Sequence, residues 1–192
     1  MTFQTVWGDE SAPWMHVPLA WPDPDFGVPM NFAADVAIKF GQEHGEGFRR
    51  ERYLHRLLAH LAPYDGRELG GLYLWLGEPL LPPVLATLEI YETVGAVEET
   101  FPLLGHADDP GLGTEVTPAP HPELGLGSRY VRRVKTRKGV FGSAVRTEVR
   151  WVWRVRDTQD LVLTIERDDP EELARILPDV EALIATARVA PA

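Results

Sequence analysis

The feature that most constrains the fold is an alternation of side chains between residues 141 and 156. Every second residue from Phe141 to Val155 belongs to a largely apolar series that includes Trp151 and Trp153. The even-numbered residues from Gly142 to Arg156 are mainly charged, and four of them are arginines. Because successive side chains of a β-strand point to opposite faces of a sheet, this pattern predicts a half-buried antiparallel strand.

Further strands are predicted on both sides of this segment. Residues 128–137 precede it across a turn at Gly139, and residues 161–166 follow it after a polar turn, which makes a three-stranded meander. Two other runs, 69–76 and 84–94, are rich in residues that favour buried strands. A weaker alternation over 32–40 predicts one more strand.

Two helices are expected to flank these strands. The sequence Asp169-Pro170-Glu171-Glu172 supplies a cap, a first-turn proline and acidic residues that suit a helix start. An apolar stripe then runs to Ala187, with a kink or a break expected at Pro178, and should pack on the meander. Apolar residues at helical spacing predict a second helix over 48–62. The fold class is therefore predicted to be α+β, a mainly antiparallel β-sheet flanked by helices.

The chain of 192 residues is expected to form one domain with an arm. Residues 1–31 contain five prolines and no sustained periodicity, which predicts an extended, irregular arm. Residues 32–192 form the single α+β domain. Within it, residues 100–127 hold five prolines and five glycines, which predicts a long loop.

Three tryptophans in the arm, Trp7, Trp14 and Trp21, are candidate binding residues. Their spacing of seven residues suggests a coiled coil, but the intervening prolines would break such a helix. Large apolar rings on a polar arm usually pack against the parent domain, which is the favoured interpretation. Insertion into a partner protein is the alternative.

The order of the predicted elements resembles that of the PsbP-like family, an antiparallel α/β/α sandwich. The segments that carry the likeness are Tyr130, Trp151 to Trp153, Leu161 to Ile165 and Leu173 to Arg188. The family includes photosystem extrinsic subunits, a Ran-binding import factor and many bacterial proteins of unknown role, and no catalytic signature unites it. The resemblance implies a binding or accessory function. The chain departs from the family pattern in the tryptophan-bearing arm and in residues 100–127.

Composition excludes several classes of function. The net charge of -10 argues against indiscriminate binding to nucleic acid or to an anionic membrane. The absence of cysteine excludes disulfides, thiolate nucleophiles and thiolate metal sites. No stretch approaches the roughly 18 apolar residues of a membrane helix, and the N-terminal segment lacks the pattern of a signal peptide. We therefore expect a cytoplasmic protein.

The segment from Arg129 to Arg156 concentrates positive charge, with ten basic residues opposed only by Glu148. Guanidinium groups form paired hydrogen bonds with carboxylates and phosphates. The strand pattern places several of them on one face of the sheet, which predicts a binding surface for an acidic protein, with nucleic acid disfavoured. The candidate residues are Arg132, Arg146, Arg150, Arg154 and Arg156. Alternatively, acidic residues of the same chain neutralise this face.

Motifs for catalysis and cofactor binding are missing from the sequence. It contains no Gly-x-Ser-x-Gly elbow and no phosphate-binding loop, and His55 and His60 lack the spacing of zinc ligands. No cofactor and no metal are expected. The leading hypothesis is a non-enzymatic accessory or adaptor protein that binds another protein through the arginine face, the tryptophan arm or both.

Two other hypotheses remain open. One is a small-ligand-binding protein or an enzyme, with a pocket between the sheet and residues 100–127 where His106 or His121 acts. The other is a structural subunit of a larger assembly, in which the arm becomes ordered only on neighbouring subunits.

Overall fold

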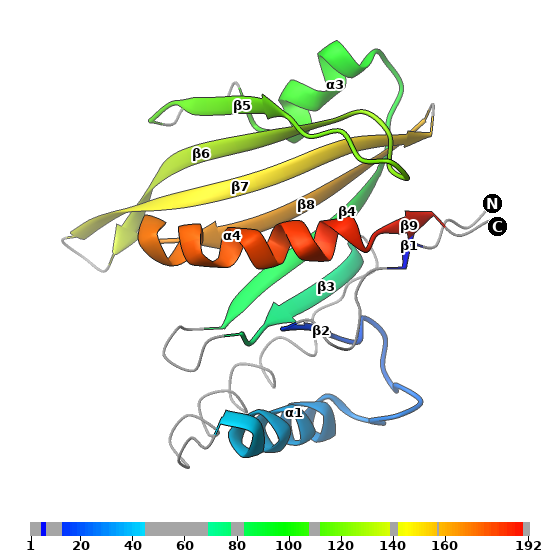
Figure 1. The fold of residues 1–192 in the computed structure, drawn as a ribbon, viewed down its shortest axis with the longest axis vertical. Helices are drawn as coiled ribbons and strands as arrows, with labels where there is room; N and C mark the ends of the chain where they lie inside the picture. The colour runs from blue at the N-terminus through cyan, green and yellow to red at the C-terminus, as the bar shows by residue number, and fades with distance from the viewer. Residues whose placement is uncertain are drawn as a thin grey trace.

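The computed structural model describes residues 5–6, 13–44, 69–77, 83–107, 112–138, 142–156 and 158–189. Its main element is a seven-stranded sheet in the order β2-β3-β4-β8-β7-β6-β5, in which every neighbouring pair is antiparallel (Figure 1). The strands are β2 (Trp14–His16), β3 (Leu69–Trp75), β4 (Val84–Glu92), β5 (Thr114–Pro118), β6 (Gly127–Lys138), β7 (Gly142–Arg156) and β8 (Gln159–Arg167).

Within the described ranges, three helices accompany the sheet: α1 (Pro29–His44), α3 (Val97–Leu104) and α4 (Pro170–Ala185). Two short strands, β1 (Thr5–Val6) and β9 (Arg188–Val189), pair separately. The predicted α+β class, a mainly antiparallel sheet flanked by helices, is confirmed.

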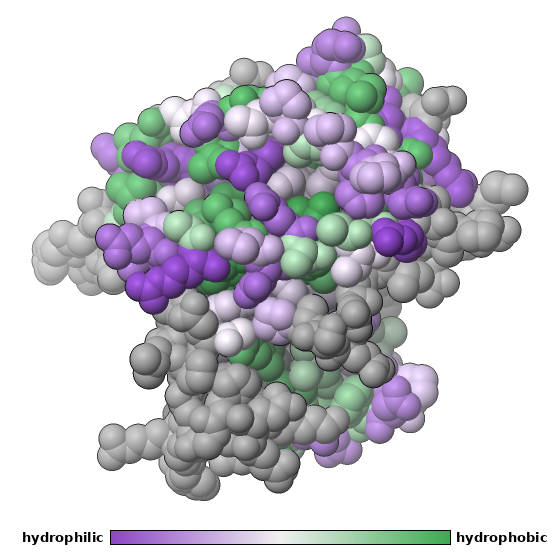
Figure 2. Space-filling view, viewed as in Figure 1, coloured by the Kyte–Doolittle hydropathy of each residue, from purple (hydrophilic) through white to green (hydrophobic). Residues whose placement is uncertain are grey.

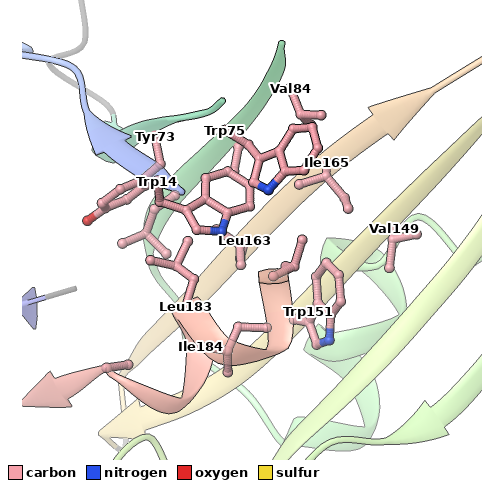
Figure 3. Packing of buried hydrophobic residues seen from close by; sticks show 14 of the residues in the cluster. Trp14, Tyr73, Trp75, Val84, Val149, Trp151, Leu163, Ile165, Leu183 and Ile184 are labelled. Carbon is pink, nitrogen blue, oxygen red and sulfur yellow. The ribbon is translucent and has the colours of Figure 1, made fainter. Parts of the chain in front are cut away.

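Helix α4 covers one face of the meander formed by β6, β7 and β8. As predicted, Asp169 caps it, because its side chain accepts a hydrogen bond of 2.8 Å from the Glu171 amide. The helix continues through Pro178 as one element, so of the expected kink or break, the break does not occur. Its buried residues pack with Trp151, Trp153 and their strand neighbours in the largest hydrophobic cluster of the described residues (Figure 3).

Helices α1 and α3 pack on the opposite face of the sheet. Phe32 and Val36 of α1 pack against Leu72 and Leu74, which alternate along β3 with Tyr73 and Trp75 of the α4-side cluster. At the other end, Phe101 of α3 packs against Tyr130, Val152 and Val162. Both faces of the sheet are therefore partly covered, and β7 is more deeply buried than a strand with one solvated face.

The expected strand over 32–40 is wrong, because these residues belong to α1. The buried residues Phe32, Ala33, Val36 and Ala37 follow a helical spacing of one, four and five residues. Pro29 occupies the first turn, where a helix tolerates a missing amide donor. Short runs of apolar residues fit both periodicities, and tertiary packing decides between them.

The expected long loop over 100–127 is wrong in part. Helix α3 extends to Leu104, and β5 forms an edge of the sheet beside β6. An edge strand has one row of backbone groups outside the ladder, so it tolerates Pro118 at its end. The predicted irregular arm likewise contains strand β2 of the sheet. The predicted helix over 48–62 lies outside the described residues.

Candidate functional site

The alternation along β7 places its arginines on the sheet face opposite α4, as predicted. Two of them, Arg150 and Arg154, contact α3 or the segment that leads into it. Arg150 Nη1 donates to the carbonyl of Leu104 at 3.1 Å, and Arg154 Nη1 donates to the carbonyl of Gly95 at 3.2 Å. The face that should be open to a partner is thus already in contact with the chain itself.

Glu148 is the centre of the first group of charges. Its Oε1 lies 3.0 Å from Arg132 Nη2 and 3.1 Å from Arg150 Nε. Glu148 and Arg132 are buried, and the side chain of Arg150 is only 12% exposed. His106 completes the group, with its Nδ1 3.2 Å from Arg132 Nη2. Two sequence-predicted binding residues therefore have a structural partner in the same sheet.

Asp160 is the centre of the second group. It is fully buried, and its carboxylate accepts hydrogen bonds from Nε and Nη2 of Arg154. Thr93 also donates to Asp160, at 2.8 Å, and Arg154 Nη2 donates to Thr100 at 2.8 Å. Arg154 thus connects β7 and β8 to the end of β4 and the first turn of α3.

The remaining arginines of β7 are also engaged. Arg146 Nη1 lies 2.8 Å from Glu166, and its Nε lies 2.9 Å from Asp168. The hydrogen bond that Arg146 donates to Asp168 raises the pKa of Arg146, which keeps the guanidinium charged. Arg156 has a partner as well. The alternative that the chain neutralises its own arginine face is therefore what the structure contains.

Two of the three tryptophans of the predicted arm, Trp14 and Trp21, pack against the domain. Trp14 is buried, and its indole nitrogen donates to the carbonyl of Asp179 at 3.0 Å, while Trp75 donates to the carboxylate of the same residue at 2.8 Å. The ring of Trp21 packs against Phe32 with centroids 6.3 Å apart. Trp14 and Trp21 thus follow the favoured interpretation, and Trp7 lies outside the described residues.

A different group of cations stays open, on the part of the β6–β7 ribbon that we call the distal hairpin (residues 133–146). Only residues 128–132 of β6 pair with β5, and β7 pairs with β8 only from Thr147 onwards. The distal hairpin therefore extends past both neighbouring strands (Figure 1). Arg133 and Lys135 are exposed there, and neither forms an ion pair with any residue in the described ranges. The number of basic residues along the sequence does not distinguish these cations from the neutralised ones. The distinction depends on the register of β6 with β5 and of β7 with β8.

His121 is buried in the turn that follows β5. Its Nδ1 accepts hydrogen bonds from the amides of Glu123 and Leu124, at 3.1 and 3.2 Å. Burial lowers the pKa of His121 below its ordinary value of 6.5, and burial lowers the pKa of His16 too. The neutral ring is thus the form that the folded chain favours.

The free energy of unfolding is expected to be constant above pH 6.5 and to fall at lower pH. A histidine whose pKa is lower in the folded chain than in the unfolded chain takes up a proton more readily when the chain is unfolded. Acidification below pH 6.5 therefore favours the unfolded state and lowers the free energy of unfolding. Urea unfolding at pH 7.5 and at pH 5.5 measures the loss. His121→Asn keeps an acceptor without the titration, so its pH-dependent loss should be smaller. An equal loss in this variant would assign the effect to other groups.

A cleft of about 330 Å³ lies beside the turn that follows β5. It is bordered by residues 117–120 of the segment that was expected to cover a pocket, but neither His106 nor His121 lines it. In the described part of the chain, no group of three or more metal-ligating side chains is close enough to hold an ion. No described helix is both long and apolar enough to cross a membrane.

Comparisons with known proteins place the chain in no family. No family model matches it, and no curated protein matches it. Among solved structures, the chain is similar to LpqN of Mycobacterium tuberculosis, a protein involved in cell envelope biogenesis, with a TM-score of 0.48 and 11% identity. The match covers 100% of this chain and 93% of LpqN.

Proposed function

We propose that this chain is a non-enzymatic accessory protein that binds an acidic surface of another protein through its distal hairpin. The observation that carries the proposal is the exposure of Arg133 and Lys135 on the distal hairpin, where neither forms an ion pair with a residue of the described ranges. Residues 133–146 contain five basic residues and no acidic residue, and the hairpin extends beyond the strands on either side. Of these cations, Arg146 is neutralised by Glu166 and Asp168, whereas Arg133 and Lys135 of β6 are exposed and pair with no acidic residue of the described ranges.

The distal hairpin replaces the arginines of the rest of β7 as the proposed surface. A partner carboxylate would have to displace Glu148 or Asp160 to reach Arg150 or Arg154, and those pairs are buried. Arg133 and Lys135 require no such exchange. Both side chains belong to one face of β6, because they are two residues apart and face Thr147 and Val145 across the ribbon.

A protein partner fits this surface better than nucleic acid. The whole chain carries a net charge of -10, so its long-range field repels an extended polyanion. Hydrophilic side chains cover the side of the molecule where α4 begins, close to the hairpin in this view (Figure 2). Val145 is 43% exposed on the ribbon, which adds an apolar contact to the charges. A short acidic patch on a protein matches this mixture of local charge and apolar area.

The proposal includes a cytoplasmic location and an absence of catalysis. Both rest on sequence features, namely the lack of cysteine and of a catalytic motif. The PsbP-like resemblance supports an accessory role in the same way. If the chain is a subunit of a larger assembly, the same proposal applies, and the distal hairpin is then its contact with a neighbouring subunit.

Reversing two charges on the hairpin tests the proposal. The double variant Arg133→Glu/Lys135→Glu should lose the salt-sensitive partners that the wild-type protein retains in affinity purification from its native cell. Its midpoint of thermal unfolding should change little, because exposed, unpaired side chains contribute less than about 0.5 kcal/mol to stability. The control is Arg175→Glu, an exposed site on α4 with the same type of charge change. Unchanged capture by the double variant would reject the hairpin as the binding surface.

A further inference from the structure

The cleft beside β5 lies between α4 and the α4-side face of β6 and β7. Its described lining includes the rings of Pro118, Pro120 and Trp151, the side chain of Ile184, and the charged residues Arg129 and Glu181. Ile184 extends from α4 towards Trp151 (Figure 3). The volume of about 330 Å³ falls at the lower end of the range for small-ligand sites. Apolar walls with a few polar groups are typical of such sites.

Trp151 differs from the other buried tryptophans in its hydrogen bonding. Trp14, Trp75 and Trp153 donate their indole N–H to Asp179 O, Asp179 Oδ2 and Ala119 O, respectively. Trp151 is 3% exposed, yet its indole nitrogen has no acceptor among the residues of the described ranges. This nitrogen is not one of the solvent-excluded polar atoms without a partner, so its N–H is accessible from the cleft and can donate to an acceptor atom of a ligand there.

Arg129 brings a second incompletely used donor to the same place. It faces Trp151 directly across the β6–β7 register. Its Nη1 reaches Glu181 Oε1 only at 3.5 Å, which is a long contact, and its Nε is buried with no acceptor. The side chain of Glu181 is 60% exposed, so it can turn into solvent when another anion approaches. A guanidinium group and an indole N–H thus converge on one cleft.

We propose that this cleft binds a small amphipathic carboxylate with an aromatic or other flat apolar body. The carboxylate would accept from the guanidinium of Arg129 and from the indole N–H of Trp151. The apolar body would pack against Pro118, Pro120 and Ile184. This site lies on the α4 side of the sheet and does not depend on the distal hairpin.

Titration with 1-naphthoate tests the site, with neutral 1-naphthamide as the matched probe. The indole signals of the ¹⁵N-labelled protein report each tryptophan separately, and Trp151→Phe assigns the signal of Trp151 by its loss. We expect naphthoate to shift the Trp151 signal and to leave those of Trp14 and Trp75 in place. Naphthamide should bind at least about tenfold more weakly than naphthoate, because it lacks the charge that pairs with Arg129.

Two cleft variants and one control separate specific from general binding. Arg129→Gln and Trp151→Phe should each weaken naphthoate binding about tenfold, since each removes one donor. Arg175→Gln, on the exposed side of α4, should bind as the wild type does. The proposal is overturned if naphthoate shifts no indole signal, if it shifts all of them alike, or if both cleft variants retain wild-type affinity. Equal binding of naphthamide would overturn the carboxylate class.

Discussion

Glu148→Ala is expected to lower the free energy of unfolding by about 3–5 kcal/mol, because it leaves two arginines in the sheet without their carboxylate. Arg132 and Arg150 each lie within 3.1 Å of Glu148 Oε1, and their side chains are 9% and 12% exposed. Both side chains therefore have little access to water in the folded chain. The value follows from chemical denaturation with urea, provided that the slope of the transition is unchanged.

Glu166→Ala is the matched control for this experiment. Glu166 pairs with Glu148 in the β7–β8 register, but its side chain is 42% exposed and its partner Arg146 also has Asp168. Exposed ion pairs contribute about 0–1 kcal/mol, so this variant should remain close to the wild type. Similar losses of unfolding free energy in the two variants would show that burial does not increase the contribution of Glu148 to stability.

Asp160→Ala is expected to cost about 3–5 kcal/mol as well, and its effect should spread towards α3. The carboxylate of Asp160 is fully buried and is the acceptor for Arg154 and Thr93. Its removal takes away the buried carboxylate of Arg154, whose side chain is 13% exposed and which also donates to the neutral acceptors Gly95 and Thr100. Hydrogen exchange of the amides of α3 should therefore accelerate more than that of α4.

Asp168→Ala serves as the control for the second variant, because Asp168 is 51% exposed and shares Arg146 with Glu166. The loss of unfolding free energy for Asp160→Asn should lie between the losses for Asp160→Ala and Asp168→Ala, since asparagine keeps acceptor and donor atoms but loses the charge. A loss below about 1 kcal/mol for Asp160→Ala would contradict the role of this pair as a structural link. Uniform acceleration of exchange would contradict the local effect on α3.

Regular patterns that extend over many residues were predictable from the sequence, and so was a helix start with a strong cap. The alternation of β7 extends over fifteen residues, and the Asp169 cap precedes a complete apolar stripe, so both elements form where expected. Helix α1 is predicted as a strand because alternate residues from Phe32 to Phe40 are apolar, whereas the side chains that are buried follow a helical spacing. Its packing on β3 is a long-range contact that no local pattern contains.

The state of the arginine face was less accessible to prediction. Glu148 stands two residues from both Arg146 and Arg150, so its place on their face could be read directly from the sequence. Its contact with Arg132 depends on the β6–β7 register, and the contact of Asp160 with Arg154 depends on the turn between β7 and β8. The open charges of the distal hairpin depend on where β5 and β8 end, which composition does not encode.

The pairing of β1 with β9 has a practical consequence for these experiments. Thr5 and Val6 lie beside Val189 and Arg188, so segments from opposite ends of the chain meet at one place. In Figure 1 this place is on the right, whereas the distal hairpin extends to the left. A tether attached at either terminus would therefore hold the molecule on a solid support in a similar orientation, with the cationic ribbon directed away from the support.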